Sequence, residues 1–272
     1  MKEPIGSASS PSPMRTSSPN AASPPVELFD SASPMMRRLF RMLADVAVQN
    51  VPVLLRGESG TGKSMFARAL HGASARRTRP FVAVYCPALT ASLPSSARGG
   101  QPIDRDRAAV RALRARVAAA DGGTILMDEV AALSAHSQVE TLRLLDEVPR
   151  AAKAHGARII ASTQRDLEGA VESGEFRKDL FFRLDVVELS IPPLRDRRDD
   201  ILSIARYYLD HFAQAEGLPS PQIAARAEQA LLAYKWPGNI RELRNAMQRA
   251  TILARDRALD LDVLPERLAA GL

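Results

Sequence analysis

Up to Pro192, apolar and polar positions alternate in blocks typical of short strands followed by helices. Five apolar runs, at the length and composition of buried strands, are separated by longer segments with helical spacing. The runs cover residues 51–55, 81–84, 124–127, 158–161 and 186–189. Because strands that alternate with helices form parallel sheets, the pattern predicts an α/β fold in which helices cover a parallel sheet.

The pattern changes after Pro193, where strand-like runs stop. Helical spacing follows over residues 199–215, 223–234 and 239–254, with helix-breaking glycines and prolines between them. At the other end, residues 1–25 contain seven Ser and six Pro and almost no large apolar side chains, which is typical of a disordered tail. The sequence therefore predicts a tail over 1–25, an α/β domain over 26–192 and a small all-helical domain over 193–272.

Composition argues against membrane and disulfide-rich proteins. Apolar residues make up 46% of the chain, but no run approaches the ~18 apolar residues that a membrane-spanning helix needs. The N-terminus lacks the apolar stretch of a signal peptide, so we expect a cytoplasmic protein. The single cysteine, Cys86, cannot form an intramolecular disulfide or a cysteine-based metal cluster, and we expect a small buried side chain there.

The net charge of +6 is concentrated in one segment. Residues 98–116 hold six arginines against two aspartates, which gives +4 of the total. The spacing within this segment predicts a helix with Val110, Leu113 and Val117 on one face and arginines 107, 111 and 114 on another. Such an arginine face fits either a solvated helix surface or a nucleic-acid-binding surface.

A glycine-rich motif follows the first apolar run and precedes a helical segment. The pattern G-x-x-x-x-G-K-[ST] is formed by Gly57, Glu58, Ser59, Gly60, Thr61, Gly62, Lys63 and Ser64. Its glycines allow the loop to fold back so that backbone N–H groups and the helix N-terminus point at phosphate oxygens. Lys63 would then contact the β- and γ-phosphates, and the Ser64 hydroxyl would ligate Mg²⁺. A glycine-rich turn with an exposed lysine is the alternative, but the flanking strand and helix favour phosphate binding.

A second motif indicates the same chemistry. The run Thr124 to Met127 is followed directly by two carboxylates, Asp128 and Glu129. At the C-terminal end of its strand, Asp128 would hold Mg²⁺ through water, and Glu129 would polarise the attacking water. Adjacent acidic residues after a strand often form only a solvated turn, but here two independent motifs converge on hydrolysis of ATP or GTP.

Taken together, several segments resemble the AAA+ ATPase domain of the bacterial enhancer-binding, NtrC-like activators of sigma-54. The segments are Gly57 to Lys63, Asp121 to Thr124 with Asp128 and Glu129, Phe176 to Leu180, Pro192 to Arg197, and Trp236 to Leu243. They occur in the family's order, and the resemblance extends from about Val26 to Leu268. It implies a P-loop AAA+ parallel sheet flanked by helices, a small helical lid, and ATP with Mg²⁺ as cofactors. Nothing in the chain resembles the base-recognition motif of GTPases.

The resemblance assigns roles to four further residues. Thr163, after the fourth strand, matches the sensor I residue that detects the γ-phosphate, and Arg241 matches sensor II in the lid. Arg177 and Arg183 match arginines that reach into the neighbouring subunit's site, where a guanidinium stabilises charge on the transferred phosphoryl group. The family works as a ring, usually a hexamer, so we expect ATP-dependent self-association. Without the resemblance, each arginine would be interpreted as part of a surface ion pair.

Four features depart from the family pattern. The loop signature Gly-Ala-Phe-Thr-Gly-Ala, which contacts the sigma factor, is absent, and residues 95–102 read Ser-Ser-Ala-Arg-Gly-Gly-Gln-Pro in its region. The connection over 146–157, where the family has a second contact loop, is short. Tyr85 stands where the family has an asparagine that couples the catalytic glutamate to these loops, and Gln164 replaces another asparagine. We also expect no DNA-binding domain in this chain, since no helix-turn-helix pattern follows the lid.

Two functional hypotheses follow from these features. In the first, the chain is an ATPase whose ring remodels a protein partner, with sigma-54 RNA polymerase holoenzyme the partner that the family implies. In the second, the chain binds ATP and joins rings of its own kind or of a related activator, and modulates them without activating sigma-54. The intact phosphate-binding and acidic motifs favour hydrolysis, whereas the missing loop signature favours a role other than standard promoter opening.

Overall fold

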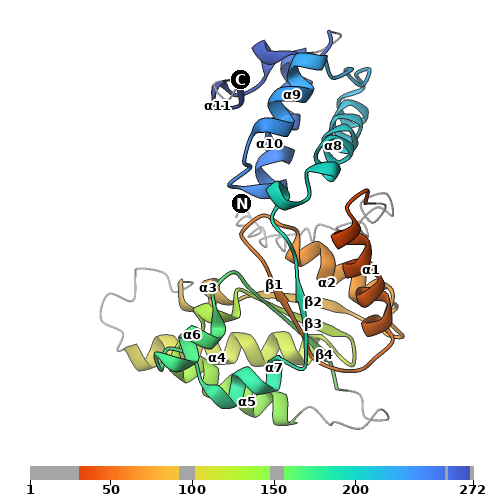
Figure 1. The fold of residues 1–272 in the computed structure, drawn as a ribbon. Coiled ribbons are helices and arrows are strands. Elements are labelled where there is room, and N and C mark those ends of the chain that lie inside the picture. The colour runs from red at the N-terminus through yellow and green to blue at the C-terminus, as the bar shows by residue number, and fades with distance from the viewer. Residues whose placement is uncertain (1–30, 92–101, 148–155, 255–256, 270–272) are drawn as a thin grey trace, which may run out of the picture.

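The computed structural model describes residues 31–91, 102–147, 156–254 and 257–269, which form a sheet-containing body with a helical lid above it (Figure 1). The predicted tail, most of the segment 95–102 and most of the connection 146–157 lie outside these ranges. Among the described residues, no helix is both long enough and apolar enough to cross a membrane.

The larger body is built on a five-stranded sheet of order β2-β3-β4-β1-β5, in which all neighbouring strands are parallel. The strands are β1 (Val53–Arg56), β2 (Phe81–Tyr85), β3 (Thr124–Asp128), β4 (Arg158–Thr163) and β5 (Val187–Ser190). Each overlaps one of the predicted apolar runs, so the predicted parallel α/β sheet is confirmed.

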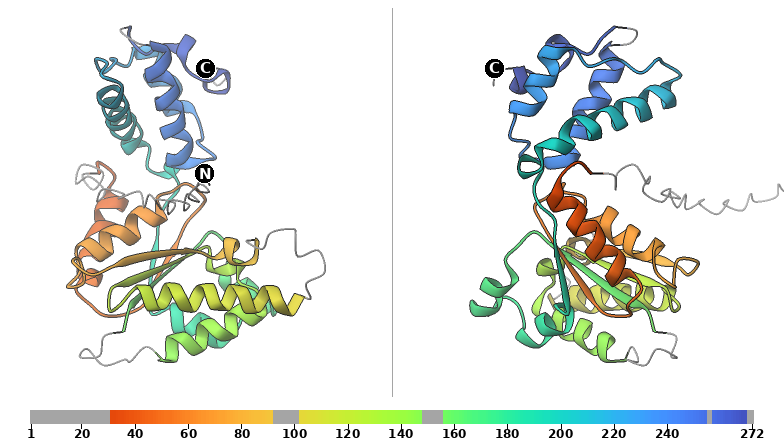
Figure 2. Two further views of the ribbon diagram at one scale, coloured as in Figure 1. Left: turned by 180° about the vertical axis from the view of Figure 1, so that it is seen from behind. Right: turned by 45° about the vertical axis from the view of Figure 1, so that its right-hand side comes forward.

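Helices cover both faces of this sheet, as Figure 2 shows. One face carries α1 (Pro34–Ala47) and α2 (Lys63–Gly72); the other carries α3 (Cys86–Ala91), α4 (Pro102–Ala119), α5 (Ala135–Glu147), α6 (Leu167–Glu172) and α7 (Lys178–Leu184). Successive strand residues point to opposite faces. Leu55 therefore belongs to the same apolar cluster as Phe66 of α2, whereas Leu54 belongs to a second cluster that contains Leu113 of α4 and Leu180 of α7. Two-sided burial explains why the inner strands β1, β3 and β4 are mostly apolar, whereas the edge strands β2 and β5 are less buried and β5 alternates apolar and polar residues.

From Pro102 onward, the basic segment forms the helix α4, as its spacing predicts. Leu113 is buried against the sheet, while Arg107 and Arg111 are exposed. Arg114 donates to Glu140 of α5 at 2.9 Å, and this contact is the main reason that the pKa of Glu140 lies below its ordinary value. The arginine face of α4 is therefore solvent-exposed and partly paired with α5.

The lid has a core of its own around Trp236. It consists of α8 (Ile201–Glu216), α9 (Ala225–Ala233), α10 (Asn239–Ala254) and α11 (Glu266–Ala269). The Trp236 side chain is fully buried, and its Nε1 donates to the Leu231 carbonyl at 2.8 Å. Trp236 and Asn239 adopt φ of +50° and +52°, so the turn between α9 and α10 is tight and holds the start of α10 beside the loop after β1.

Candidate functional site

The loop between β1 and α2 depends on glycine where the lid approaches it. Gly60 and Gly62 have φ of +81° and +108°, a left-handed conformation that side chains rarely adopt. A Cβ on Gly60 would lie 2.3 Å from the carbonyl oxygen of Gly238 in the lid turn, so only glycine fits there. The loop leads directly into α2, which begins at Lys63, so the free N–H groups of the first helical turn are available to an anion.

Lys63 links this loop to the acidic end of β3. Its side chain is only 6% exposed, and its Nζ donates to the Gly57 carbonyl at 2.8 Å and lies 3.1 Å from Oε1 of Glu129. Packing holds the ammonium in place at the centre of the loop. The structure therefore brings together the lysine and the carboxylate that two separate motifs predicted.

Ser64 and Asp128 present oxygens to each other at the base of the loop. Ser64 Oγ lies 3.5 Å from Asp128 Oδ2, while Asp128 Oδ1 accepts a short hydrogen bond from the Ser162 hydroxyl. Hydroxyl and carboxylate oxygens are the hard donors that Mg²⁺ prefers. The residues present therefore fit a magnesium ion, with Ser162 fixing the carboxylate that would hold it.

Two contacts orient the Glu129 carboxylate, one with Lys63 and one with Gln164. Glu129 adopts φ +57°, its Oε1 faces Lys63, and its Oε2 accepts from the Gln164 backbone N–H at 3.2 Å. Its own N–H donates to Ser162 Oγ at 3.3 Å. Ser162 and Gln164 belong to no motif that predicts these roles. Their signal in the sequence is the polar run Ser162, Thr163 and Gln164, which follows the apolar residues Ile159 to Ala161 of β4.

The cavity above the loop has a volume of about 280 Å³ and is walled by both bodies. Its lining residues are Ser59, Gly60, Gly62, Lys63, Ser64, Met65, Tyr85, Asp128, Glu129, Gln164, Tyr208, Ile240, Arg241 and Arg244. Thr163 is not among them, because its hydroxyl is buried and accepts from the Arg165 N–H at 3.0 Å. Gln164 faces the cavity instead. Tyr85, in register with Asp128 at the end of β2, is 57% exposed there.

The lid is fastened to the glycine-rich loop by charged and polar contacts. Arg241 donates to Ser59 Oγ at 2.9 Å, which places the predicted sensor II residue at the cavity. Glu58 forms a bidentate ion pair with Arg195, at 2.6 and 2.9 Å, and accepts a hydrogen bond from Asn239 Nδ2 at 3.1 Å. The hydrogen bonds from Arg195 and then from Asn239 lower the pKa of Glu58 to about 2. Arg195 and Asn239 lie in the segments quoted above, but only the fold identifies them as its partners.

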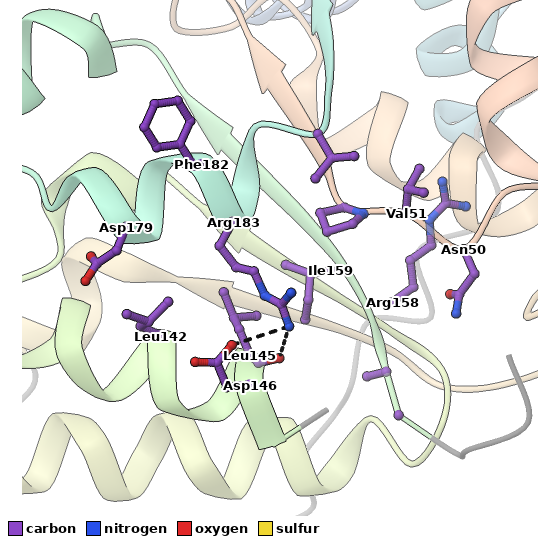
Figure 3. A pocket seen from close by; sticks show the side chains of 14 residues that line it. Asn50, Val51, Leu142, Leu145, Asp146, Arg158, Ile159, Asp179, Phe182 and Arg183 are labelled. Atoms are coloured by element: carbon purple, nitrogen blue, oxygen red, sulfur yellow. Dashed lines mark hydrogen bonds and ion pairs between the residues drawn. The ribbon is translucent and has the colours of Figure 1, made fainter. Parts of the chain in front are cut away.

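Neither Arg177 nor Arg183 lines the cavity above this chain's own glycine-rich loop. Arg177 is exposed at the start of α7 and pairs with Asp179 at 2.7 Å. Arg183, at the other end of α7, donates to the Leu145 carbonyl at 2.7 Å and lies 3.5 Å from Oδ1 of Asp146, as Figure 3 shows. It lines a cavity of about 630 Å³ that also touches Arg158, where β4 begins. Because the glycine-rich loop follows the opposite ends of these strands, Arg183 cannot serve the site of its own subunit.

Cys86 takes no part in the cavity. Its side chain is buried, as expected, and burial is the main cause that raises the pKa of its thiol to about 12. A thiol that stays protonated is a poor nucleophile and a poor metal ligand. The chemistry of the site therefore depends on the lysine, the hydroxyl and the two carboxylates.

Comparison with known proteins gives matches over nearly all of the described chain. The family model of the Sigma-54 interaction domain matches residues 29–190, and that of the AAA+ ATPase lid domain matches residues 195–271. The transcriptional regulatory protein ZraR of Klebsiella oxytoca is 43% identical over 81% of this chain and 51% of its own length. The Nif-specific regulatory protein of Azotobacter vinelandii is 39% identical over 85% of this chain and 45% of its own. This chain thus spans about half the length of these relatives.

A solved structure supports the same comparison. The crystal structure of NtrX from Brucella abortus in complex with ATP is 32% identical, has a TM-score of 0.74, and is matched over 89% of this chain and 55% of its own. The matched 89% of this chain is larger than the part of the chain in either the sheet-containing body or the lid, so the match includes residues of both.

Proposed function

The chain belongs to the sigma-54-activator family of AAA+ transcriptional regulators, and from that premise we propose that it binds ATP with Mg²⁺ and hydrolyses it within a ring of identical subunits. The observation that carries the proposal is the convergence of Lys63, Ser64, Asp128 and Glu129 around one cavity closed by the lid. We place this activity in the cytoplasm, with remodelling of a protein partner as its output; RNA polymerase holoenzyme is the partner that the family implies.

Each residue has a distinct task in this proposal. Lys63 supplies a fixed positive charge for the β- and γ-phosphates, and the N–H groups of the loop and of α2 bind their oxygens. Ser64 and Asp128 would hold Mg²⁺, which when bound neutralises charge on the phosphate chain. Glu129 orients the attacking water and accepts its proton. The contacts of Glu129 with Lys63 and Gln164 hold this base beside the cavity.

Arg183 and Arg177 complete the site from a neighbouring subunit. Arg183 lies on α7 and Arg177 directly precedes this helix, and neither lines the nucleotide cavity of its own chain, so we infer that their charge acts on a phosphate across a subunit boundary. A heterologous contact of this kind, repeated from one subunit to the next, closes into a ring when its rotation divides a full turn evenly. We take the ring to be a hexamer, as the family resemblance implies.

The identity of Tyr85 supports the second hypothesis, in which ATP binding assembles a ring that modulates a related activator. Where the family has an asparagine, this side chain is exposed in the cavity, and among the described residues Glu129 is held by Lys63 and Gln164 instead. In this hypothesis, hydrolysis depends on the contacts of Glu129 with Lys63 and Gln164. Transmission of the nucleotide state to the partner would depend on the position that Tyr85 occupies. Under this hypothesis the chain turns over ATP without opening sigma-54 promoters.

The proposal is tested by the rate of phosphate release as a function of protein concentration, with and without sigma-54 holoenzyme. We expect specific activity to rise with concentration, because an isolated subunit lacks its neighbour's arginines. Glu129→Gln is the matched control, since it should keep ATP binding and lose turnover. Turnover by the control at the wild-type rate, or no ATP binding by the wild-type chain, would refute the proposal. Stimulation by the holoenzyme separates the two hypotheses.

A further inference from the structure

The lid contributes a second arginine to the nucleotide cavity. Arg241 and Arg244 are three residues apart on α10, a spacing that places side chains on the same face of a helix. Both line the cavity that contains Lys63, Asp128 and Glu129. The family resemblance assigns a role to Arg241 and none to Arg244.

The Arg244 guanidinium packs on the ring of Phe212 of α8, which in turn stacks on Tyr208. The guanidinium carbon of Arg244 lies 5.8 Å from the ring centroid of Phe212, within the range of a cation–π contact. Phe212 is buried and stacks on Tyr208 with centroids 6.2 Å apart and planes 22° apart, and Tyr208 reaches the same cavity. A guanidinium supported by an aromatic ring keeps its N–H groups free for hydrogen bonds to an anion.

Among the described residues, Arg244 is also the cavity cation whose side chain makes neither an ion pair nor a hydrogen bond. Lys63 lies 3.1 Å from Glu129, and Arg241 is bonded to Ser59, but within the described residues Arg244 makes neither an ion pair nor a hydrogen bond. The charged residues that line the cavity are three cations and two carboxylates. Without Arg244 these charges would balance, leaving no net positive charge to attract a polyphosphate.

We propose that Arg244 binds the phosphate chain of the nucleotide together with Arg241 and favours a triphosphate over a diphosphate. This inference rests on the proposed function, since it concerns the same cavity. A planar guanidinium can donate two parallel hydrogen bonds to a phosphate group, and its attraction grows with the number of phosphate charges. The closed position of the lid over the loop, held by Arg241 on Ser59, brings Arg244 to this side of the cavity.

The test is calorimetric titration of the whole chain with a non-hydrolysable ATP analogue and, separately, with ADP, both with Mg²⁺. Two variants remove the charge: Arg244→Ala, and Arg244→Gln, which keeps an aliphatic stem against Phe212. Arg249→Ala is the matched control, because Arg249 is an exposed arginine of α10 that does not line the cavity. We expect both Arg244 variants to bind the triphosphate analogue about tenfold more weakly, the scale of one hydrogen bond to a charged group.

The outcomes separate the inference from the proposed function. ADP binding should weaken by a clearly smaller factor than binding of the triphosphate, and Arg249→Ala should match the wild type. Wild-type affinity in both Arg244 variants, or an equal loss for the two nucleotides, would overturn the inference while leaving the ATPase proposal in place. Failure of the wild-type chain to bind either nucleotide would overturn the proposed function, and the inference with it.

Discussion

Replacing Arg183 with alanine should abolish turnover while leaving the fold and ATP binding nearly intact. The side chain lies at the far edge of the sheet from the P-loop of its own subunit, so it contributes nothing to that subunit's nucleotide contacts. In a ring, its charge would meet the phosphoryl group bound to the next subunit, where an arginine contributes ~10³–10⁵ in rate. We therefore expect kcat to fall by about that factor and the Kd for ATP to change little.

The structure separates this catalytic loss from a folding defect. Within the subunit, Arg183 makes one hydrogen bond to the Leu145 carbonyl at 2.7 Å and a loose pair with Asp146, whose side chain is 61% exposed. Such contacts contribute about 1 kcal/mol to stability. The expected rate loss corresponds to about 4–7 kcal/mol of transition-state stabilisation. Urea unfolding and steady-state phosphate release, measured on the same preparation, distinguish the two effects.

Mixing two inactive variants provides the decisive assay. Arg183→Ala keeps an intact Glu129, and Glu129→Gln keeps an intact Arg183, so a mixed ring contains sites that combine both intact residues. In an equimolar random mixture about one site in four is complete, and activity should recover toward a quarter of the wild-type value. Arg206→Ala, which removes an exposed arginine paired with Glu228 of the lid, is the control and should keep full activity.

Two results would refute the reasoning. If Arg183→Ala alone turns over ATP at the wild-type rate, the residue stabilises no transition-state charge. If the mixture has only the summed residual activity of its components, although sedimentation shows mixed rings, the arginine does not act across the boundary between subunits.

Three other changes test the remaining parts of the site. Lys63→Ala should abolish binding of a fluorescent ATP analogue, because it removes the charge that faces the phosphates; tight binding by this variant would contradict the assignment of the loop. Glu58→Gln should loosen the lid, with a loss in urea-unfolding free energy of about 1 kcal/mol or less for so exposed a pair. The pKa of Glu58 is lowered to about 2 from its ordinary value of 4.5, so the difference in unfolding free energy between the wild type and this variant should be complete above about pH 5 and shrink as the pH falls toward about 2. A difference in free energy that persists unchanged at about pH 2 would show that the charge of the Glu58 carboxylate is not its cause. Finally, saturating protein and ATP should yield no transcript from a supercoiled sigma-54 promoter, because residues 95–116 hold arginines in place of an aromatic loop tip; robust ATP-dependent transcripts would show that this segment serves the same purpose.

Local sequence patterns determined the sheet and the centre of the site. Strands buried on both faces are mostly apolar, and this made the inner strands β1, β3 and β4 recognisable as short runs, while the edge strands β2 and β5 were recognisable by their β-branched and aromatic residues. The loop at Gly57 to Ser64 was equally readable, because the conformation that wraps a phosphate chain imposes its glycines and lysine at fixed spacing. Asp128 could be placed beside this loop since carboxyl ends of parallel strands lie at one edge.

Contacts between distant segments were decided only by the tertiary structure. The alignment of Asp128 by Ser162, and of Glu129 by the N–H of Gln164, requires the pairing of β3 with β4, which no local pattern encodes. The same holds for the exposed position of Tyr85 in the cavity.

The position of each arginine relative to the nucleotide site is the clearest example of this division. Arg183, Arg195 and Arg244 are equally plausible surface residues in the sequence, because a long charged side chain needs no particular periodicity. Folding directs Arg195 to the P-loop glutamate, Arg244 to the nucleotide cavity and Arg183 to the opposite edge of the sheet. The sequence determines which charges are available, and the packing of the lid and of α7 on the sheet determines where each one acts.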